Sequence, residues 1–369
     1  MSEQFEIIIL ASLTAIACAL PGTFLVLRRM SLMSDAISHA ILLGIVLAFF
    51  VTESLTSPWL VVGATLVGLL TVSLTELIIR SRKLKKDAAI GLVFPFLFSI
   101  GVILISRNTF DVHIDTDCVL FGEIALAPFD RLIVGTQDWG PQGFWIMGTI
   151  VLLNLFFIGL FYKELKIATF DASLAATLGF RPGVIHYGLM TLVSITAVGA
   201  FQNVGSILVV ALMIAPPAAA FLLTGRLSTM LMVSTALGFL AAVSGYGMAY
   251  TLDASIAGSM ATMSGVIFMI ILFVAPERGI IAKYILRRWR KWDLPMETLA
   301  VHLLQAEETR ADETEQIVSH MYNHMLWTDD FTSEVIAQCL EQGLIKKSGN
   351  KLTLTDYGRE KAKISVSKS

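Results

Sequence analysis

Two side chains that can bind a metal ion lie four residues apart in an apolar stretch of the chain. The stretch 31-SLMSDAISHAILLGIVLAFF-50 carries Asp35 and His39. Residues i and i+4 share one face of an α-helix, so the carboxylate and the imidazole would point toward one place. Mixed oxygen and nitrogen ligands suit manganese, iron and zinc, and the pair supplies half of such a site. A structural alternative is that Asp35 caps the helix and His39 bonds a neighbouring carbonyl.

The helices that must position this pair are predicted to span a membrane. Of the 369 residues, 55% are hydrophobic and 15% are charged, and the mean hydropathy is +0.74, which is too apolar for a water-soluble fold of this size. Because an ionised Asp rarely faces hydrocarbon, we expect Asp35 to face a pathway. We predict an all-α polytopic membrane protein with about nine transmembrane helices, eight being possible, near residues 6–27, 35–52, 59–79, 88–105, 143–162, 184–200, 204–223, 228–249 and 255–275.

The charges between these segments predict an orientation. Basic residues gather in alternate connections, such as 80-RSRKLKK-86 and the chain after Arg278. The positive-inside rule places those connections in the cytoplasm, so we expect the N-terminus outside and the C-terminus inside. The outer connection 111-DVHIDTDCVLFGEI-124 is acidic; it either attracts cations or a carrier protein, or is an ordinary solvated loop. Pro216 and Pro217 lie within an expected span and predict a kink or break there.

A change of composition near residue 293 predicts a separate cytoplasmic domain. We expect a transmembrane domain over 1–280 and a small α+β domain over 293–369. The tail 342-QGLIKKSGNKLTLTDYGREKA-362 is typical of a strand, a turn, a second strand and a helix, and it resembles the winged helix of iron-dependent repressors. Between Asp293 and Gln342, however, eleven acidic residues stand against one basic residue. DNA would be repelled, so we expect no nucleic-acid partner.

This domain also contains a second pair of histidines, His320 and His324. They are either a regulatory metal sensor or ordinary residues of a solvated helix. We interpret the domain as a partner-docking or regulatory module.

Four motifs, in the same order along the chain, resemble one known family. They are 28-RRMSLMSDAISHAILLGIVLAF-49, 117-DCVLFGEI-124, 171-DASLAATLGFRP-182 and 203-NVGSILVVALMIAPPAAA-220. Over about residues 6–280 the chain is similar to the metal-ion ABC transporter permeases, the ABC-3 family, which import manganese, zinc or iron.

The resemblance implies roles for particular residues. Asp35 and His39 would coordinate the ion in the pathway, and Asp117 would be a secondary contact. The segment 171–182 is similar to the short cytoplasmic helix by which ABC importers dock on their ATPase, which would give Asp171, Ala175 and Gly179 a coupling role.

The resemblance also implies a set of partners. The chain has no GxxxxGK[ST] phosphate loop, so ATP hydrolysis is expected in separate cytoplasmic subunits and the chain itself is not an enzyme. An extracellular metal-binding protein would deliver manganese or zinc as cargo, with no permanently bound cofactor. The permease would pair with itself or with a related permease, surrounded by lipid, in a bacterial cell membrane.

The alternatives to an ATP-driven importer are a secondary carrier and a membrane enzyme. A proton-coupled secondary metal carrier would share the intramembrane Asp and His but would need no ATPase. A membrane metalloprotease would need a motif such as HExxH within the spans, and none is present.

Overall fold

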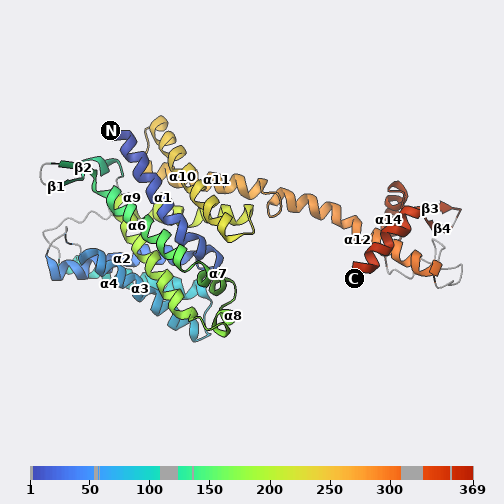
Figure 1. Ribbon diagram of the computed structural model, residues 1–369, viewed down its shortest axis with the longest axis horizontal. Helices are drawn as coiled ribbons and strands as arrows, with labels where there is room; N and C mark the ends of the chain where they lie inside the picture. Colours follow the sequence, from blue (N-terminus) through green and yellow to red (C-terminus); the bar gives the residue numbers. More distant parts are fainter. Residues whose placement is uncertain are drawn as a thin grey trace. The chain divides into compact units, whose positions relative to one another are not determined.

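The computed structural model describes residues 3–53, 57, 59–108, 124–134, 137–308, 327–349 and 351–368. The chain divides into two compact units, Met1–Gly279 and Ile280–Ser369. In the described part of the first unit, eight helices are long and apolar enough to cross a membrane (Figure 1). They are α1 (Glu3–Leu27), α2 (Leu32–Thr52), α3 (Trp59–Arg80), α4 (Lys86–Asn108), α6 (Gln142–Leu160), α9 (Pro182–Leu223), α10 (Leu227–Leu252) and α11 (Ile256–Val274).

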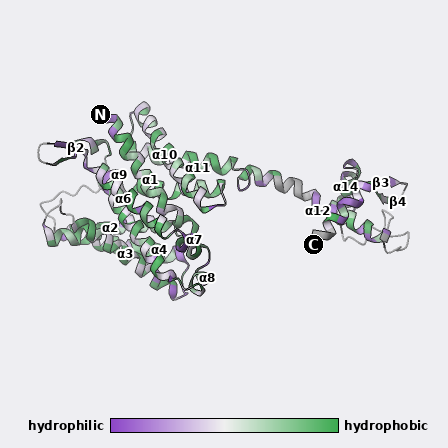
Figure 2. Ribbon diagram, in the orientation of Figure 1, coloured by the Kyte–Doolittle hydropathy of each residue, from purple (hydrophilic) through white to green (hydrophobic). Residues whose placement is uncertain are grey.

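The apolar runs of the sequence account for these helices, since a backbone in hydrocarbon must satisfy its own hydrogen bonds. Figure 2 shows hydrophobic residues along these helices and hydrophilic residues in the connections. Sharp turns lie at the ends of three of these helices. Arg29 (φ 55°), Glu53 (φ 47°) and Asp253 (φ 50°) take left-handed backbone conformations at the ends of α1, α2 and α10. The prediction of an all-α polytopic membrane protein is confirmed.

Helices α2 and α3 pack closely because glycines face each other. A Cβ atom built on Gly44 would lie 2.5 Å from the backbone oxygen of Gly63, and one built on Gly63 would lie 2.7 Å from the oxygen of Gly44. Such small residues let membrane helices approach to backbone contact. The two helices are therefore held at a distance that no larger side chain would permit.

Helix α9 is 42 residues long and contains one residue outside the helical region, Gly205 (φ 77°, ψ 167°). At about 1.5 Å per residue a straight helix of this length would measure roughly twice the hydrocarbon thickness of about 30 Å. The positions along α9 first follow α1 toward its start and then return. His186 contacts Arg28 near the end of α1, and Thr196 and Ala17 share the partner Asn154. Asn203 and Leu10 both border Gly143, whereas Met213, further along α9, borders Gly22. Gly205 thus joins an outgoing limb to a returning limb.

This reversal explains why nine spans were expected and eight helices are described. The spans 184–200 and 204–223 are the two limbs of α9. The polar residues 201-FQN-203, expected to form an outer connection, stay helical. The Nδ2 of Asn203 donates to the Gly199 oxygen at 2.8 Å, so this polar side chain is satisfied within the helix. The proline pair Pro216 and Pro217 is also buried within α9, and the residue with non-helical backbone angles is Gly205.

The described residues of the first unit form two hydrophobic clusters. The larger one joins α1, α2, α6, α9 and their neighbours around side chains such as Phe24, Ile37 and Met213. A smaller one lies within α2, α3 and α4 and consists of Ala40, Leu43, Val67, Val93 and Leu97. At the centre of the larger cluster, the Nδ2 of Asn154 in α6 donates to the Ala17 oxygen of α1 at 2.9 Å and to Thr196 Oγ1 of α9 at 3.1 Å.

A short 3-10 helix and a hairpin precede α6. These elements are η1 (Ile124–Phe129), β1 (Arg131–Val134) and β2 (Gln137–Pro141). The strands are antiparallel, with Ile133 opposite Asp138. Arg131 Nε contacts Asp138 Oδ2 at 2.7 Å, and Arg131 Nη2 donates to Glu6 Oε1 at 3.5 Å. This arginine therefore attaches the hairpin to the first turn of α1.

Where the structure describes the second unit, it contains helices and a hairpin: α12 (Ile280–Glu308), α14 (Asp329–Glu341), β3 (Ile345–Ser348), β4 (Lys351–Leu354) and α15 (Asp356–Lys368). The strands are antiparallel, with Ile345 opposite Leu354. A buried cluster that includes Leu299, Val335 and Leu352 joins α12, α14 and the hairpin. Arg359 of α15 donates to Glu307 of α12 at 2.9 Å. The order of helix, hairpin and helix is the one expected, and the winged-helix assignment stays a prediction.

Candidate functional site

Asp35 and His39 lie together on one face of α2. Helix α2 begins at Leu32 with Ser31 at its N-cap, so Asp35 does not occupy the capping position. Asp35 Oδ1 and His39 Nε2 are 3.4 Å apart. The side chains are 36% and 29% exposed, respectively, so the pair is neither sealed in the core nor fully open. The i, i+4 spacing places both polar groups where one ion could meet them.

The imidazole of His39 is oriented by aromatic side chains of α4. Its ring stacks on Phe94 with centroids 5.8 Å apart, and it meets the edge of Phe98 at 6.0 Å. Among the described residues, no third His, Cys, Asp or Glu completes a group that could hold a metal. One oxygen and one nitrogen ligand leave a transition metal with open positions, which water or another chain must fill.

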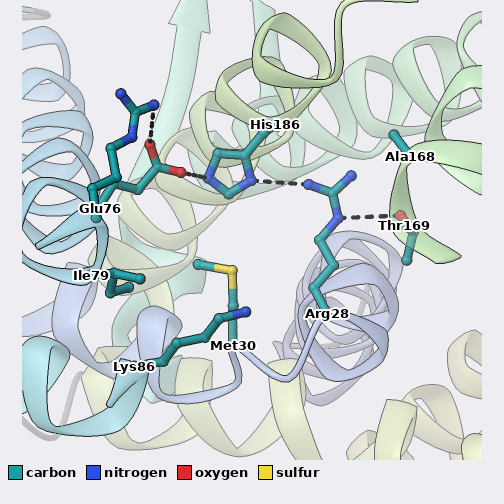
Figure 3. A pocket seen from close by; sticks show the side chains of 9 residues that line it. Arg28, Met30, Glu76, Ile79, Lys86, Ala168, Thr169 and His186 are labelled. Atoms are coloured by element: carbon teal, nitrogen blue, oxygen red, sulfur yellow. Dashed lines mark hydrogen bonds and ion pairs between the residues drawn. The ribbon is translucent and has the colours of Figure 1, made fainter. Parts of the chain in front are cut away.

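A second polar cluster, not predicted from the sequence, lies where α1, α3 and α9 end or begin (Figure 3). His186 of α9 stands between two side chains: its Nε2 is 2.6 Å from Glu76 Oε1 of α3, and its Nδ1 is 3.0 Å from Arg28 Nη1. Arginine can only donate, so Nδ1 accepts and the imidazole is in its neutral form. Tyr187 donates from its hydroxyl to Glu76 Oε2 at 2.7 Å.

This cluster lines a cavity of about 340 Å³ and reaches the connection after α6. Arg28 Nε donates to Thr169 Oγ1 at 3.2 Å, and Thr169 belongs to helix α7 (Tyr162–Phe170). Burial lowers the pKa of Arg28 to about 10, because removal from water disfavours its charged form. The sequence does carry a signal, since Glu76 is the one acidic residue in the expected span 59–79.

The segment expected to couple to an ATPase forms a capped short helix, α8 (Ala172–Thr177). Asp171 Oδ1 accepts from the backbone N–H groups of Ser173 and Leu174, both at 2.9 Å. Ala175 is buried, whereas Leu174 is 49% exposed. Gly179 follows the C-cap of α8 with φ 87°, a left-handed conformation that favours glycine. The sequence therefore builds a rigid turn with an exposed apolar side chain.

Three of the predicted site residues lie outside the described residues. They are Asp117 in the acidic connection, and His320 and His324 in the second unit.

Known proteins resemble this chain over most of its length. The model of the ABC 3 transport family matches residues 3–275. The zinc transport system membrane protein TroD of Treponema pallidum is 45% identical over 96% of this chain and 96% of its own length. The manganese transport system membrane protein MntD of Bacillus subtilis is 47% identical over 77% of this chain and 96% of its own length.

A solved structure shares the fold. PsaBC from Streptococcus pneumoniae, in complex with Fab, matches with a TM-score of 0.63 and 31% identity, covering 75% of this chain and 94% of that one. The alignment with TroD extends into the second unit, since it spans 96% of this chain, whereas the match to the family model ends at residue 275.

Proposed function

The chain belongs to the ABC 3 transport family, and from this membership we propose that it is the permease of an importer whose cargo is manganese or zinc. Family membership makes it a multi-pass membrane transport subunit rather than an enzyme. We place the cargo site at Asp35 and His39, because these side chains lie 3.4 Å apart on a membrane helix and are partly exposed. A carboxylate beside an imidazole offers ligands that both ions accept.

The exposed side of this pair supports pairing with a second permease. An ionised Asp35 facing lipid would be costly, because charged residues of membrane helices almost always face the protein interior or a water-filled cavity. A second copy or a related permease that covers this face of α2 removes the cost and adds its own carboxylate and imidazole. Two such pairs supply four ligands, which is enough for a tetrahedral ion. The ion then passes between the two chains.

The segment 171–182, which contains the capped helix α8, is our proposed contact with the ATPase subunits. The cap at Asp171 and the turn at Gly179 hold α8 rigid. A displacement of Leu174 by the ATPase therefore moves the whole helix and does not deform it. The hydrogen bond between Thr169 and Arg28 connects the preceding helix to the end of α1, seven residues before Asp35. ATP-driven movement at this segment can therefore reach the metal-binding helix.

We further propose that the basic connections and the second unit are cytoplasmic and that the N-terminus is outside. An extracellular metal-binding protein then delivers the ion on the side of the hairpin β1–β2. The domain expected over 293–369, which lies within the second unit, is a regulatory or partner-docking domain. Its removal after Asp293 tests regulation if metal uptake is compared at high and low external metal.

Uptake measurements test the proposed cargo site. In cells lacking other manganese and zinc importers, Asp35→Ala and His39→Ala should each lower uptake at limiting metal by at least about tenfold, since losing even an outer-shell contact costs 10–100-fold in metal affinity. Asp253→Asn is the control, because Asp253 caps α10 and Asn tolerates its left-handed backbone. Unchanged uptake in both variants would refute the assignment.

Reconstitution tests the energy source. Vesicles containing the permease and its ATPase subunits should take up metal only with ATP. Uptake by the permease alone, driven by a proton gradient, would instead establish a secondary carrier.

A further inference from the structure

The cavity beside His186 is lined by more positive than negative side chains (Figure 3). The cations are Arg28, Arg80 and Lys86, and the one carboxylate among the lining residues is Glu76. Both oxygens of this carboxylate are engaged, because Oε1 contacts His186 at 2.6 Å and Oε2 accepts from a tyrosine hydroxyl at 2.7 Å. The cation paired with it is Arg80, at 3.9 Å. Arg28 and Lys86 are left without a counter-charge among the described residues.

Arg28 is an unusual cation for its surroundings. Its guanidinium is partly buried and donates to two neutral acceptors, Thr169 Oγ1 and His186 Nδ1. Its Nη2 atom is inaccessible to water and has no hydrogen-bond acceptor within the described part of the chain. Buried guanidinium groups are normally paired with an anion, because desolvating an unpaired charge is costly. The arrangement therefore lacks a negative partner.

The start of α4 adds to the positive potential at the cavity. Lys86 is the first residue of this 23-residue helix, and it lines the cavity. The first turn of a helix presents free N–H groups and the positive end of the helix dipole, which favour phosphate groups. Asp87, the next residue, is exposed and is not one of the lining residues.

We propose that this cavity binds the phosphate group of an anionic ligand, with the headgroup of an anionic phospholipid as its source. The cavity lies at the ends of membrane-spanning helices, where α3 ends at Arg80 and α4 begins at Lys86. Basic pockets between transmembrane helices at this level bind anionic headgroups. Its volume of about 340 Å³ lies at the lower end of the usual range for ligand sites. The excess of cations rules against a divalent metal as occupant.

Binding of short-chain lipid to the purified full-length permease in detergent tests the proposal. The probes are dioctanoyl phosphatidylglycerol, dioctanoyl phosphatidylcholine and inorganic phosphate, each titrated against the protein and detected by native mass spectrometry or calorimetry. We expect phosphatidylglycerol to bind more tightly than phosphatidylcholine. Arg28→Gln should weaken its binding by at least about tenfold, as expected for loss of a charged hydrogen bond. Arg29→Gln is the matched control, because Arg29 is exposed and lies outside the cavity lining.

A second substitution keeps the test decisive if Arg28→Gln does not fold. Lys86→Gln removes an exposed cation from the rim and should also weaken binding, whereas Lys85→Gln, outside the lining, should not. Tight binding of inorganic phosphate with the same residue dependence would support the anion site and assign it to a free phosphate. Equal binding of both lipids together with no binding of phosphate would overturn the proposal. So would equal effects of Arg28→Gln and Arg29→Gln. Metal uptake is not measured, so the result is independent of the proposed cargo site.

Discussion

Replacing Gly205 by alanine should destabilise the permease, because this residue alone leaves the helical region within α9. Its backbone angles, φ 77° and ψ 167°, lie in a region that is essentially restricted to glycine. A residue with a Cβ held there costs about 1–3 kcal/mol. Since 1.4 kcal/mol is a factor of ten, the ratio of folded to unfolded protein should fall by roughly 5–150-fold.

The matched control for this prediction is Gly247→Ala. Gly247 lies within α10, and a Cβ built there meets nothing within 4 Å. Alanine is the better helix former by about 1 kcal/mol, so this variant should be neutral or more stable. Both free energies of unfolding can be measured by titrating the purified permease in mixed micelles with sodium dodecyl sulfate and following circular dichroism. If Gly205→Ala proves as stable as Gly247→Ala, then α9 does not need this conformation and the two-limb description fails.

Three further predictions concern other parts of the first unit. Gly44→Val should cost about 1–3 kcal/mol in the same unfolding assay, because its Cβ would press on the backbone oxygen of Gly63 at 2.5 Å and force α2 away from α3. Asp171→Ala removes the cap of α8, worth about 1 kcal/mol, and should lower metal-stimulated ATP hydrolysis by the assembled transporter while leaving metal binding unchanged. The backbone N–H of Gly140 is the main group that holds the pKa of Asp138 below its ordinary 3.8. The stability that the Asp138 carboxylate gives the hairpin is therefore fully present above pH 3.8 and is lost as the pH falls through the lowered pKa. Faster amide exchange in the hairpin at low pH should show this loss, and Asp138→Asn should abolish the pH dependence.

The sequence predicted the helices well because their signal is local. Runs of about 20 apolar residues are sufficient to place a membrane helix, and each expected segment corresponds to a described helix or to a limb of α9. The turn inside α9 could not be read in the same way. The polar residues 201-FQN-203 suggested a connection, but Asn203 bonds within its own helix and a single glycine makes the turn.

The candidate site was predictable only where its residues are close in sequence. The spacing of Asp35 and His39 was sufficient to place them on one face of a helix, and they lie 3.4 Å apart. The cluster around His186 joins residues more than one hundred positions apart, on α3, on α9 and in the turn after α1. No local spacing reveals such a cluster; only the packing of α1, α3 and α9 brings its members together. Whether the Asp35–His39 pair binds metal stays a prediction.

The smaller hydrophobic cluster, contained within α2, α3 and α4, bears on how the helix that carries Asp35 and His39 changes its position. Its members belong to these three helices alone, and the glycine contact between α2 and α3 allows no slack between them. If α2, α3 and α4 moved together as one body, the side chains of this cluster would therefore stay packed against one another and out of contact with water. Asp35 and His39 would then change their orientation with the loss of contacts to α9, such as that between Glu76 and Tyr187, and with no local unfolding of α2, α3 or α4.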